Sequence, residues 1–399
     1  SDVYKRQTPW RMPWKETDPL QERTRFIEDW LAGGSQNMAA LCRLYQISRK
    51  TGHKWTARFR EAGLEGLEER SHAAHAQPLR IPEELERAVV EARRAHPSWG
   101  PKKLKAWLEQ REPATLWPAA STIGEALKRA GLVRPRRRRR RLSGEASPLR
   151  NPQGANQVWT VDYKGQFRTG DGVMCYPLTV VDGHSRYLLD CAAHPRPGGR
   201  EARASLERLF RERGLPETMR SDNGSPFAST GAGRLSRLSA WWLKLGLAVE
   251  RIDPGKPQQN GRHERMHRTL KAETARPPAA TARRQQERFD GFRAEYNQER
   301  PHESLGQKPP ATQYEASQRR YPQKLEDPEY PGHWERRRVR SDGGVKFQGR
   351  TRFLSEALAG ELVGWVEVAE DIWQIWFGPA EVAIFDADAG EIWPLGKNG

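Results

Sequence analysis

A chain of 399 residues is too long for one ordinary core, so we expect two to four domains. Its 68 Lys and Arg side chains outnumber 51 Asp and Glu, and the resulting charge of +17 indicates a polyanionic partner such as nucleic acid. A mean hydropathy of −0.90 argues against a membrane protein, and three scattered cysteines argue against a disulfide framework or a zinc knuckle.

The N-terminal part predicts a helix-turn-helix domain over residues 12–75. Residues 1–11, SDVYKRQTPWR, are typical of an added or mistranslated leader before Met12, and we exclude them from the fold. A first helix is expected from Leu20 to the Gly33-Gly34 pair, because its apolar residues recur at helical spacing: Phe26, Ile27, Trp30 and Leu31. Two short helices follow, over about 37–45 and from the N-cap Ser48 to Gly63.

The second of these short helices is the candidate recognition helix. Trp55 and Phe59 can pack inward, while the opposite side carries residues that would face DNA: Arg49, Lys50, His53, Lys54 and Arg58. A solvated basic helix on a three-helix bundle is the alternative interpretation.

A second helical module is predicted over residues 76–133. Thr122 and Glu125 fit a capping box, and Gly131 fits a helix stop. The Arg-rich linker, 134–156, then carries six consecutive arginines that we expect to be disordered and to hold phosphates without reading bases: Arg136, Arg137, Arg138, Arg139, Arg140 and Arg141. A linker that only confers solubility is the alternative.

Residues 157–317 alternate between strand and helix patterns, which predicts a mixed sheet flanked by helices. The expected strands are VWTVDYKGQF, VMCYPLTVVD, SRYLLDCAAH, TMRSDNG and AVERID; the expected helices are EARASLERLFRERG, LSRLSAWWLKLG, NGRHERMHRTLKAE and QERFDGFRAEYNQER. Trp241, Trp242 and Leu245 should be buried. A Pro-rich linker, 318–333, precedes a segment, 334–399, whose Val, Trp, Phe and Ile with Gly breaks predict a small β-barrel or meander.

The segment HERMH, residues 263–267, fits the H-E-x-x-H motif of zinc proteases. Only three positions of that motif are fixed, so it is a weak signal. A zinc protease also needs a third ligand and a peptide cleft, and His263 is flanked instead by Arg262 and Arg265. We therefore disfavour the protease interpretation.

Three carboxylates lie where they could act in catalysis. Asp162 lies in the first strand, where a carboxylate is expensive to bury unless it binds a cation or hydrogen bonds. Asp222 follows the fourth strand, although Asp-Asn-Gly is also typical of a turn. Glu264 lies on a later helix. Such hard oxygen ligands suit Mg²⁺ or Mn²⁺, and two ions about 4 Å apart can promote phosphoryl transfer.

Four motifs together carry a family resemblance: WTVDYKG, SDNGSPF, PQQNGRHERMHRTLKAE and YNQERPHESL. They resemble the integrase-type catalytic core of bacterial insertion-sequence transposases, which has a ribonuclease-H-like fold. The resemblance implies a D-D-E triad in which Asp162, Asp222 and Glu264 bind two Mg²⁺ or Mn²⁺ ions. It also implies nicking at the ends of a mobile element, followed by transfer of the 3′-hydroxyl ends to target DNA.

Neighbouring residues support this interpretation. Arg268 and Lys271 share a helix face with Glu264 and could hold phosphates, while Asn223, Gly224 and Asn260 are supporting residues that shape the loop and the helix start. Asp182 and His184 fit a turn after the second strand better than a catalytic role.

The expected protein is therefore multidomain, with all-α helix-turn-helix N-terminal modules, an α/β ribonuclease-H-like core with a mixed sheet, and a small all-β C-terminal domain. Its expected partners are double-stranded DNA, as terminal inverted repeats and target, and further copies of itself, in the bacterial cytoplasm at the nucleoid. The main alternative is an inactive helix-turn-helix regulator derived from a transposase. A general ribonuclease H ranks lower because it would lack the helical modules.

Overall fold

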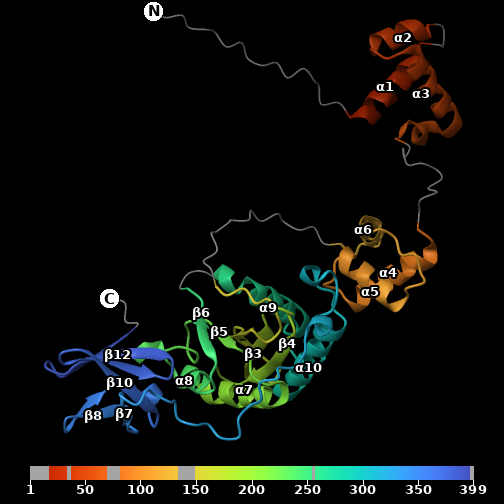
Figure 1. Ribbon diagram of the computed structural model, residues 1–399. Coiled ribbons are helices and arrows are strands. Elements are labelled where there is room, and N and C mark those ends of the chain that lie inside the picture. The colour runs from red at the N-terminus through yellow and green to blue at the C-terminus, as the bar shows by residue number, and fades with distance from the viewer. Residues whose placement is uncertain (1–17, 34–36, 70–80, 134–148, 254–256, 396–399) are drawn as a thin grey trace, which may run out of the picture. The chain divides into compact units, whose positions relative to one another are not determined.

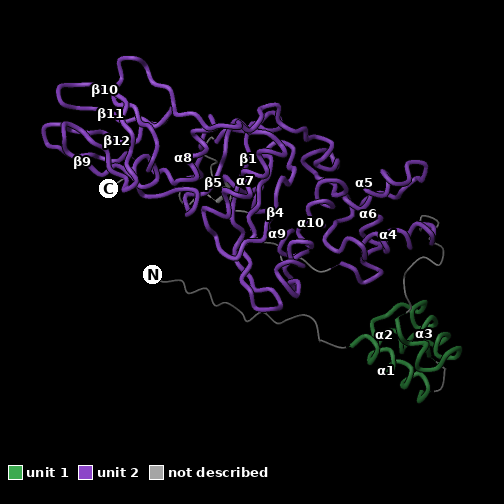
Figure 2. Tube along the Cα trace, turned by 90° about the horizontal axis from the view of Figure 1, so that it is seen from below, with its two compact units in different colours: residues 1–80 green, residues 81–399 purple. Residues whose placement is uncertain are grey.

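The computed structural model describes residues 18–33, 37–69, 81–133, 149–253 and 257–395. These residues belong to two compact units, 1–80 and 81–399 (Figure 2). The predicted leader, Met12 and the six consecutive arginines from Arg136 to Arg141 lie outside the described residues. Among the described residues, no helix is both long enough and apolar enough to cross a membrane.

The N-terminal unit is a three-helix bundle of α1 (Pro19–Ala32), α2 (Met38–Leu44) and α3 (Arg49–Ala62), followed by η1 (Gly63–Leu67). Each helix starts at a side-chain cap: Asp18, Asn37 and Ser48. Its core is made of Phe26, Ile27, Cys42, Trp55 and Leu67, whereas Leu31 is 58% exposed, so the buried side of α1 is narrower than its apolar pattern. The expected helical N-terminal module is confirmed.

The second helical module consists of α4 (Glu83–Ala95), α5 (Pro101–Arg111) and α6 (Ala120–Arg129) around buried Trp99, Leu104 and Ile123. Gly131 ends the last helix with a φ of 68°, as predicted. The predicted capping box is wrong. The helix starts at Ala120 after Ala119, which makes no side-chain cap, so Thr122 already lies inside the first turn. This earlier start still buries Ile123, Ala126 and Leu127 against the other helices.

Residues 157–317 contain one mixed sheet (Figure 1). Its strands are β1 (Val158–Tyr163), β2 (Phe167–Arg168), β3 (Met174–Asp182), β4 (Leu188–His194), β5 (Thr218–Ser221) and β6 (Ala248–Arg251). They run in the order β4-β3-β1-β5-β6, with β2 also paired to β3; β3 is antiparallel to β1 and β4, and β5 is parallel to β1 and β6. This mixed sheet confirms the expected ribonuclease-H-like fold class.

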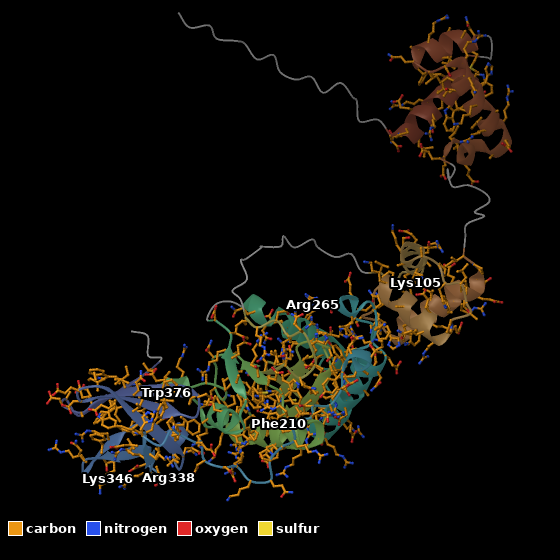
Figure 3. All side chains as sticks on the ribbon, viewed as in Figure 1. Lys105, Phe210, Arg265, Arg338, Lys346 and Trp376 are labelled. Atoms are coloured by element: carbon orange, nitrogen blue, oxygen red, sulfur yellow. The ribbon has the colours of Figure 1, made fainter. Side chains whose placement is uncertain are left out.

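Helices cover both faces of the sheet. One apolar cluster joins Trp159, Val161, Leu178 and Val180 to α7 (Gly199–Arg213) and α8 (Arg237–Lys244), with Phe210 of α7 inside it (Figure 3). Trp241, Trp242 and Leu245 are buried there, as predicted. A second cluster joins the opposite face to α9 (Gly261–Thr274) and α10 (Ala282–Gln298). Because side chains alternate along a strand, Thr160, Asp162 and Thr179 lie on this second face.

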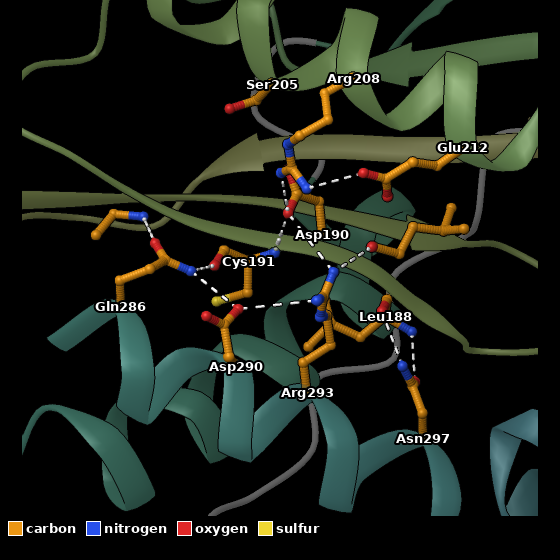
Figure 4. Close-up of polar contacts among 12 residues, drawn as sticks. Leu188, Asp190, Cys191, Ser205, Arg208, Glu212, Gln286, Asp290, Arg293 and Asn297 are labelled. Atoms are coloured by element: carbon orange, nitrogen blue, oxygen red, sulfur yellow. Dashed lines mark hydrogen bonds and ion pairs between the residues drawn. The ribbon is translucent and has the colours of Figure 1, made fainter. Parts of the chain in front are cut away.

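The edge strand β4 is tied to helices on both sides (Figure 4). Its buried Asp190 accepts hydrogen bonds from one nitrogen of Arg208 at 2.9 Å to each carboxylate oxygen, and Arg293 lies 3.9 Å away. Asn297 donates to the Leu188 carbonyl at 2.9 Å and accepts from the Leu188 amide at 2.8 Å, and Gln286 pairs similarly with Ala193 and Cys191. These side-chain amides form hydrogen bonds with backbone N–H and C=O groups of β4 that would otherwise be free to pair with another strand.

The C-terminal region is all β, as predicted. A five-stranded antiparallel sheet has the order β13-β12-β11-β10-β7, formed by β7 (Glu335–Arg338), β10 (Leu362–Ala369), β11 (Ile372–Phe377), β12 (Ala380–Asp386) and β13 (Glu391–Pro394). A hairpin of β8 (Gly344–Phe347) and β9 (Arg350–Phe353) packs into the same core. That core also includes Ala232, Leu235, Ala240 and Leu243 from the preceding region. Short 3₁₀ helices complete the chain: η2 (Ala232–Arg234), η3 (Pro257–Asn260), η4 (Glu303–Leu305), η5 (Pro310–Gln313) and η6 (Glu356–Leu358).

Candidate catalytic centre

Asp162 lies near the end of β1, on the sheet face that α9 covers. Its side chain is 22% exposed. Burial raises its pKa to about 7, and the negative charge of Asp222 adds to this effect; Lys164 opposes it, and Glu264 adds a smaller increase. A carboxyl group whose ionisation is disfavoured by two neighbouring carboxylates is a natural site for a cation.

Asp222 is exposed and directly follows β5, which runs parallel to β1. The carboxyl ends of these two strands therefore meet at one edge of the sheet, where open α/β sheets bind ligands. The Asp222 carboxylate accepts a hydrogen bond from the Gly224 amide at 3.1 Å. A Cβ atom at Gly224 would come within 3.1 Å of that carboxylate, so glycine leaves room for it. The side-chain amide of Asn223 donates to the Ile252 carbonyl, which fixes the loop against the end of β6.

Glu264 lies in the first turn of α9 and is exposed. Asn260 is the N-cap residue of this helix and is 8% exposed, but its side chain makes no capping hydrogen bond. Arg268 and Lys271 are also exposed on α9, so the predicted basic face next to Glu264 is present in the helix. Arg265 of the same helix is seen in Figure 3.

The two histidines of the H-E-x-x-H segment face the sheet instead of solvent. His263 and His267 are each 1% exposed, and their rings contact at 4.4 Å between centroids. Both Nε2 atoms lie within hydrogen-bonding distance of the Thr179 hydroxyl, at 2.7 Å for His263 and 2.6 Å for His267. The Nδ1 atom of His263 lies 2.8 Å from the Thr160 hydroxyl. The ring nitrogens that a zinc protease would use are thus engaged by threonines.

Burial also fixes the charge state of these rings. It lowers the pKa of His263 to about 3 and lowers the pKa of His267 still further, so both imidazoles are neutral at physiological pH. The Nδ1 atom of His267 lies 3.6 Å from the Asp162 carboxylate. The histidines of α9 are therefore buried and neutral, while Glu264 of the same helix is exposed.

The charges of Asp222 and Glu264 affect the pKa of Asp162, but the three side chains are not arranged to coordinate one metal ion. Within the described ranges, no three His, Cys, Asp or Glu side chains are arranged so that they could hold a metal ion. Of the two neighbouring carboxylates, Asp222 raises the pKa of Asp162 more than Glu264 does.

A shallow pocket lies beside the end of β1. Its lining combines the cationic side chains of Lys164 and Lys271 with an apolar floor that includes Phe167, Pro177 and Leu270. Lys164 was not predicted from the sequence; it directly follows β1, two residues after Asp162. Thr160 and Thr179 were also missed, and the alternation of side chains along a strand could have identified them.

His184 lies in the predicted turn, and Asp182 is the last residue of β3 directly before it. Asp182 is fully buried and its carboxylate accepts hydrogen bonds from the Ser185 amide at 2.7 Å and the Asn156 amide at 2.8 Å. It pairs in register with Trp159, whereas Asp162 pairs with Thr179 further along the same two strands. The structure therefore supports the turn interpretation.

The candidate recognition helix α3 presents the predicted basic surface. Arg49, Lys50, His53 and Lys54 are exposed, and Arg58 is half-buried. Lys54 and Arg58 also lie over the ring of buried Trp55, at 4.7 and 5.1 Å from its centroid. Phe59 is half-buried against the same core, so the inward side is also as predicted.

Four models of known protein families match parts of this chain. Residues 152–257 and 245–310 match two models described as integrase core domains. Residues 22–74 match a helix-turn-helix domain, and residues 51–127 match a homeodomain-like domain.

Related proteins come from insertion elements. An uncharacterized 39.2 kDa protein of insertion element IS476 from Xanthomonas euvesicatoria is 27% identical over 72% of this chain and 80% of its own length. An uncharacterized 31.7 kDa protein of IS407 from Burkholderia multivorans is 30% identical over 45% of this chain and 62% of its own length. Among solved structures, the HTLV-2 integrase catalytic core in complex with magnesium aligns with 41% of this chain and 99% of its own, at 13% identity and a TM-score of 0.33.

Proposed function

We propose that the chain is a DDE transposase, because it is similar to insertion-element proteins and matches helix-turn-helix and integrase core domains. It would bind the terminal inverted repeats of its element, nick the element ends and transfer the 3′-hydroxyl ends to target DNA. The observation that carries this proposal is the placement of the carboxylates: Asp162 lies near the end of β1, Asp222 directly follows the parallel strand β5, and Glu264 lies in the first turn of α9, which covers the same sheet face. Burial raises the pKa of Asp162, and the charges of Asp222 and Glu264 add to this effect.

The donor set fits Mg²⁺ or Mn²⁺. Asp162, Asp222 and Glu264 offer only hard carboxylate oxygens, and a cation between them would relieve the repulsion that raises the pKa of Asp162. In this proposal Asp162 and Asp222 are shared ligands and Glu264 is the third. Two bound ions would supply activation of the attacking oxygen and neutralisation of the leaving oxygen in an in-line displacement.

Cationic side chains would hold the DNA beside these carboxylates. Lys164, Arg268 and Lys271 border the proposed centre, and no ion pair of theirs is found in the part of the chain that the structure describes. We assign phosphate contacts to these three residues and to the linker arginines 136–141, and we assign groove contacts to the basic face of α3. Such a reaction joins two DNA ends, so we further propose a multimer acting at the nucleoid in the cytoplasm.

The test is a strand-transfer assay with purified protein, Mg²⁺ and a labelled duplex that carries an element end. Asp162→Asn, Asp222→Asn and Glu264→Gln should each reduce nicking and joining by at least about 10³-fold, since each removes a ligand needed for transition-state stabilisation. Duplex binding should be retained. Asp388→Asn and Glu287→Gln, which alter exposed carboxylates elsewhere, are the matched controls. Full activity in the triad variants would refute the proposal.

A catalytically inactive DNA-binding regulator is the second candidate. It is favoured by one observation, namely that the carboxylates as described are not arranged to hold a metal. The same assay separates the two functions. A wild-type protein that binds element ends but never nicks them with Mg²⁺ or Mn²⁺ would support the regulator.

A further inference from the structure

The segment that resembles a zinc motif contains a buried hydrogen-bonded link between α9 and the sheet. The link consists of His263, His267, Thr160 and Thr179, all 8% exposed or less. Thr160 and Asp162 lie two residues apart on β1, and Thr179 pairs directly with Asp162 across the β1–β3 ladder. The helix that carries Glu264 is thereby joined to the strand that carries Asp162.

The Thr179 hydroxyl is the centre of this link. It lies 2.7 Å from His263 Nε2, 2.6 Å from His267 Nε2 and 3.2 Å from the Asp162 carbonyl oxygen. A hydroxyl has only one proton to donate, so these three neighbours cannot all accept from it. At least one imidazole must donate to the hydroxyl, and the tautomers of the two rings are therefore coupled.

Only His267 reaches a carboxylate of the proposed centre. Its Nε2 atom faces Thr179, and its Nδ1 atom lies 3.6 Å from Asp162 Oδ2. A neutral imidazole carries one proton, so if Nδ1 bears it, Nε2 accepts the Thr179 proton. In that tautomer the N–H group of His267 faces the Asp162 carboxylate at 3.6 Å, which is longer than a hydrogen bond, so the attraction is between the N–H dipole and the charge. The opposite tautomer would turn a lone pair toward a negative oxygen, which is unfavourable.

His263 provides a natural comparison. It is the same residue type, one helical turn earlier, with the same burial and the same threonine contact. Its Nδ1 atom, however, faces the Thr160 hydroxyl at 2.8 Å instead of a carboxylate. The two histidines therefore both attach the helix to the sheet, but only one of them can orient Asp162.

We propose that His267 is a positioning residue for Asp162: held by Thr179, it directs an N–H group at the carboxylate and fixes the orientation in which that carboxylate binds a divalent cation. This inference rests on the proposed function, because it assumes that Asp162 is a metal ligand. Partners that orient a ligating carboxylate commonly affect metal affinity by about 10- to 100-fold. The H-E-x-x-H segment then serves a metal site through its second histidine without supplying a histidine ligand.

The experiment measures Mn²⁺ binding to the full chain, without DNA, from the electron paramagnetic resonance signal of free Mn²⁺. Two substitutions test the two ring nitrogens of His267 separately. His267→Asn places an amide near the position of Nδ1 and keeps a donor for Asp162, whereas His267→Gln places an amide near Nε2 and keeps only the Thr179 contact. His267→Gln should weaken Mn²⁺ binding by about 10- to 100-fold. His267→Asn should restore most of the affinity.

His263→Gln is the matched control, and the melting temperature of every variant is recorded. It should lower the melting temperature while Mn²⁺ affinity stays at the wild-type value. If His267→Asn and His267→Gln weaken Mn²⁺ binding equally, His267 only packs the helix. The same conclusion follows if His263→Gln weakens Mn²⁺ binding in proportion to its lost stability.

The Asp162→Asn variant distinguishes this inference from its premise. If the wild type binds Mn²⁺ and Asp162→Asn does not, the proposed metal site stands, and unchanged affinity in both His267 variants overturns the positioning role alone. If the wild type does not bind Mn²⁺, or Asp162→Asn binds it equally well, the proposed metal site and the positioning role are both overturned.

Discussion

The Asp162 side chain should make the stability of the cation-free protein depend on pH. Its folded-state pKa of about 7 lies above the ordinary value of 3.8, so the folded state binds more protons than the unfolded state between these values. Stability should therefore fall as the pH rises from about 4 to about 7 and level off above. The shift corresponds to at most about 4 kcal/mol, since one pKa unit is about 1.4 kcal/mol.

Asp162→Asn removes that charge and should raise the melting temperature above that of the wild type at pH 8 in the presence of EDTA. At pH 4.5 the difference should largely vanish, because the wild-type carboxyl group is then protonated. Mg²⁺ should stabilise the wild type at pH 8 and leave the variant unchanged. A variant that is less stable than the wild type at pH 8 without Mg²⁺ would contradict the assignment of mutual repulsion at this site.

At the scale of single elements, the clamp on β4 should be the most sensitive polar contact of the sheet edge. Asp190 has a side chain only 4% exposed and is held by Arg208 and Arg293. Asp190→Asn removes the buried counter-charge of Arg208 and Arg293, but these guanidinium groups are 48% and 31% exposed, so we expect a loss of about 1 to 3 kcal/mol in the free energy of unfolding. Chemical denaturation followed by tryptophan fluorescence would measure it.

Asp290→Asn is the control for this clamp, because Asp290 also faces Arg293, at 3.8 Å, but is 52% exposed. Asp290→Asn should lower the free energy of unfolding by less than about 1 kcal/mol. Equal losses in the two variants would mean that burial of Asp190 does not determine the strength of the clamp.

The sequence predicted the elements of the core well, because each strand and helix there has a strong apolar period and a clear boundary. It predicted the start of α6 wrongly. The Thr122-x-x-Glu125 pattern satisfies the local rule for a cap, whereas the helix with buried Ile123 and Leu127 has Ala119 as its N-cap and so starts three residues earlier. For α9, the buried stripe His263, Met266, His267 and Leu270 already has the spacing of an inward-facing side.

The sequence pattern of α9 does not show which residues its buried side contacts. The threonines that meet the histidines come from β1 and β3, which lie far from α9 along the chain. The side chains that pair with the edge of β4, Gln286 and Asn297, are equally remote and carry no motif. The positions of Asp162, Asp222 and Glu264 were predicted through family motifs, and their roles stay predictions.

At the scale of the whole molecule, the core of the C-terminal β region extends into the preceding region. Leu235 and Leu243, 3% and 9% exposed, are buried in the same cluster as Val363, Val382 and other β-region residues. Lys244 of α8 adds ion pairs across this junction, to Glu361 at 2.6 Å and Asp327 at 3.4 Å. The predicted boundary at residue 334 therefore marks a change in amino-acid composition, but the hydrophobic core continues across it.

Leu243→Asp in the full chain should separate the two regions. An unpaired carboxylate in the shared core removes the apolar contact and adds a desolvation cost, so we expect a loss of about 2 to 5 kcal/mol in docking. Calorimetry should then show separate transitions for the sheet of β1–β6 and the sheet of β7–β13, and trypsin should cut within residues 318–333. Leu116→Asp, at a position 93% exposed, should leave melting and cleavage unchanged. Unaltered melting and protection of residues 318–333 in Leu243→Asp would show that the β region is held by other contacts, of which the Lys244 ion pairs are the first to test by Lys244→Met.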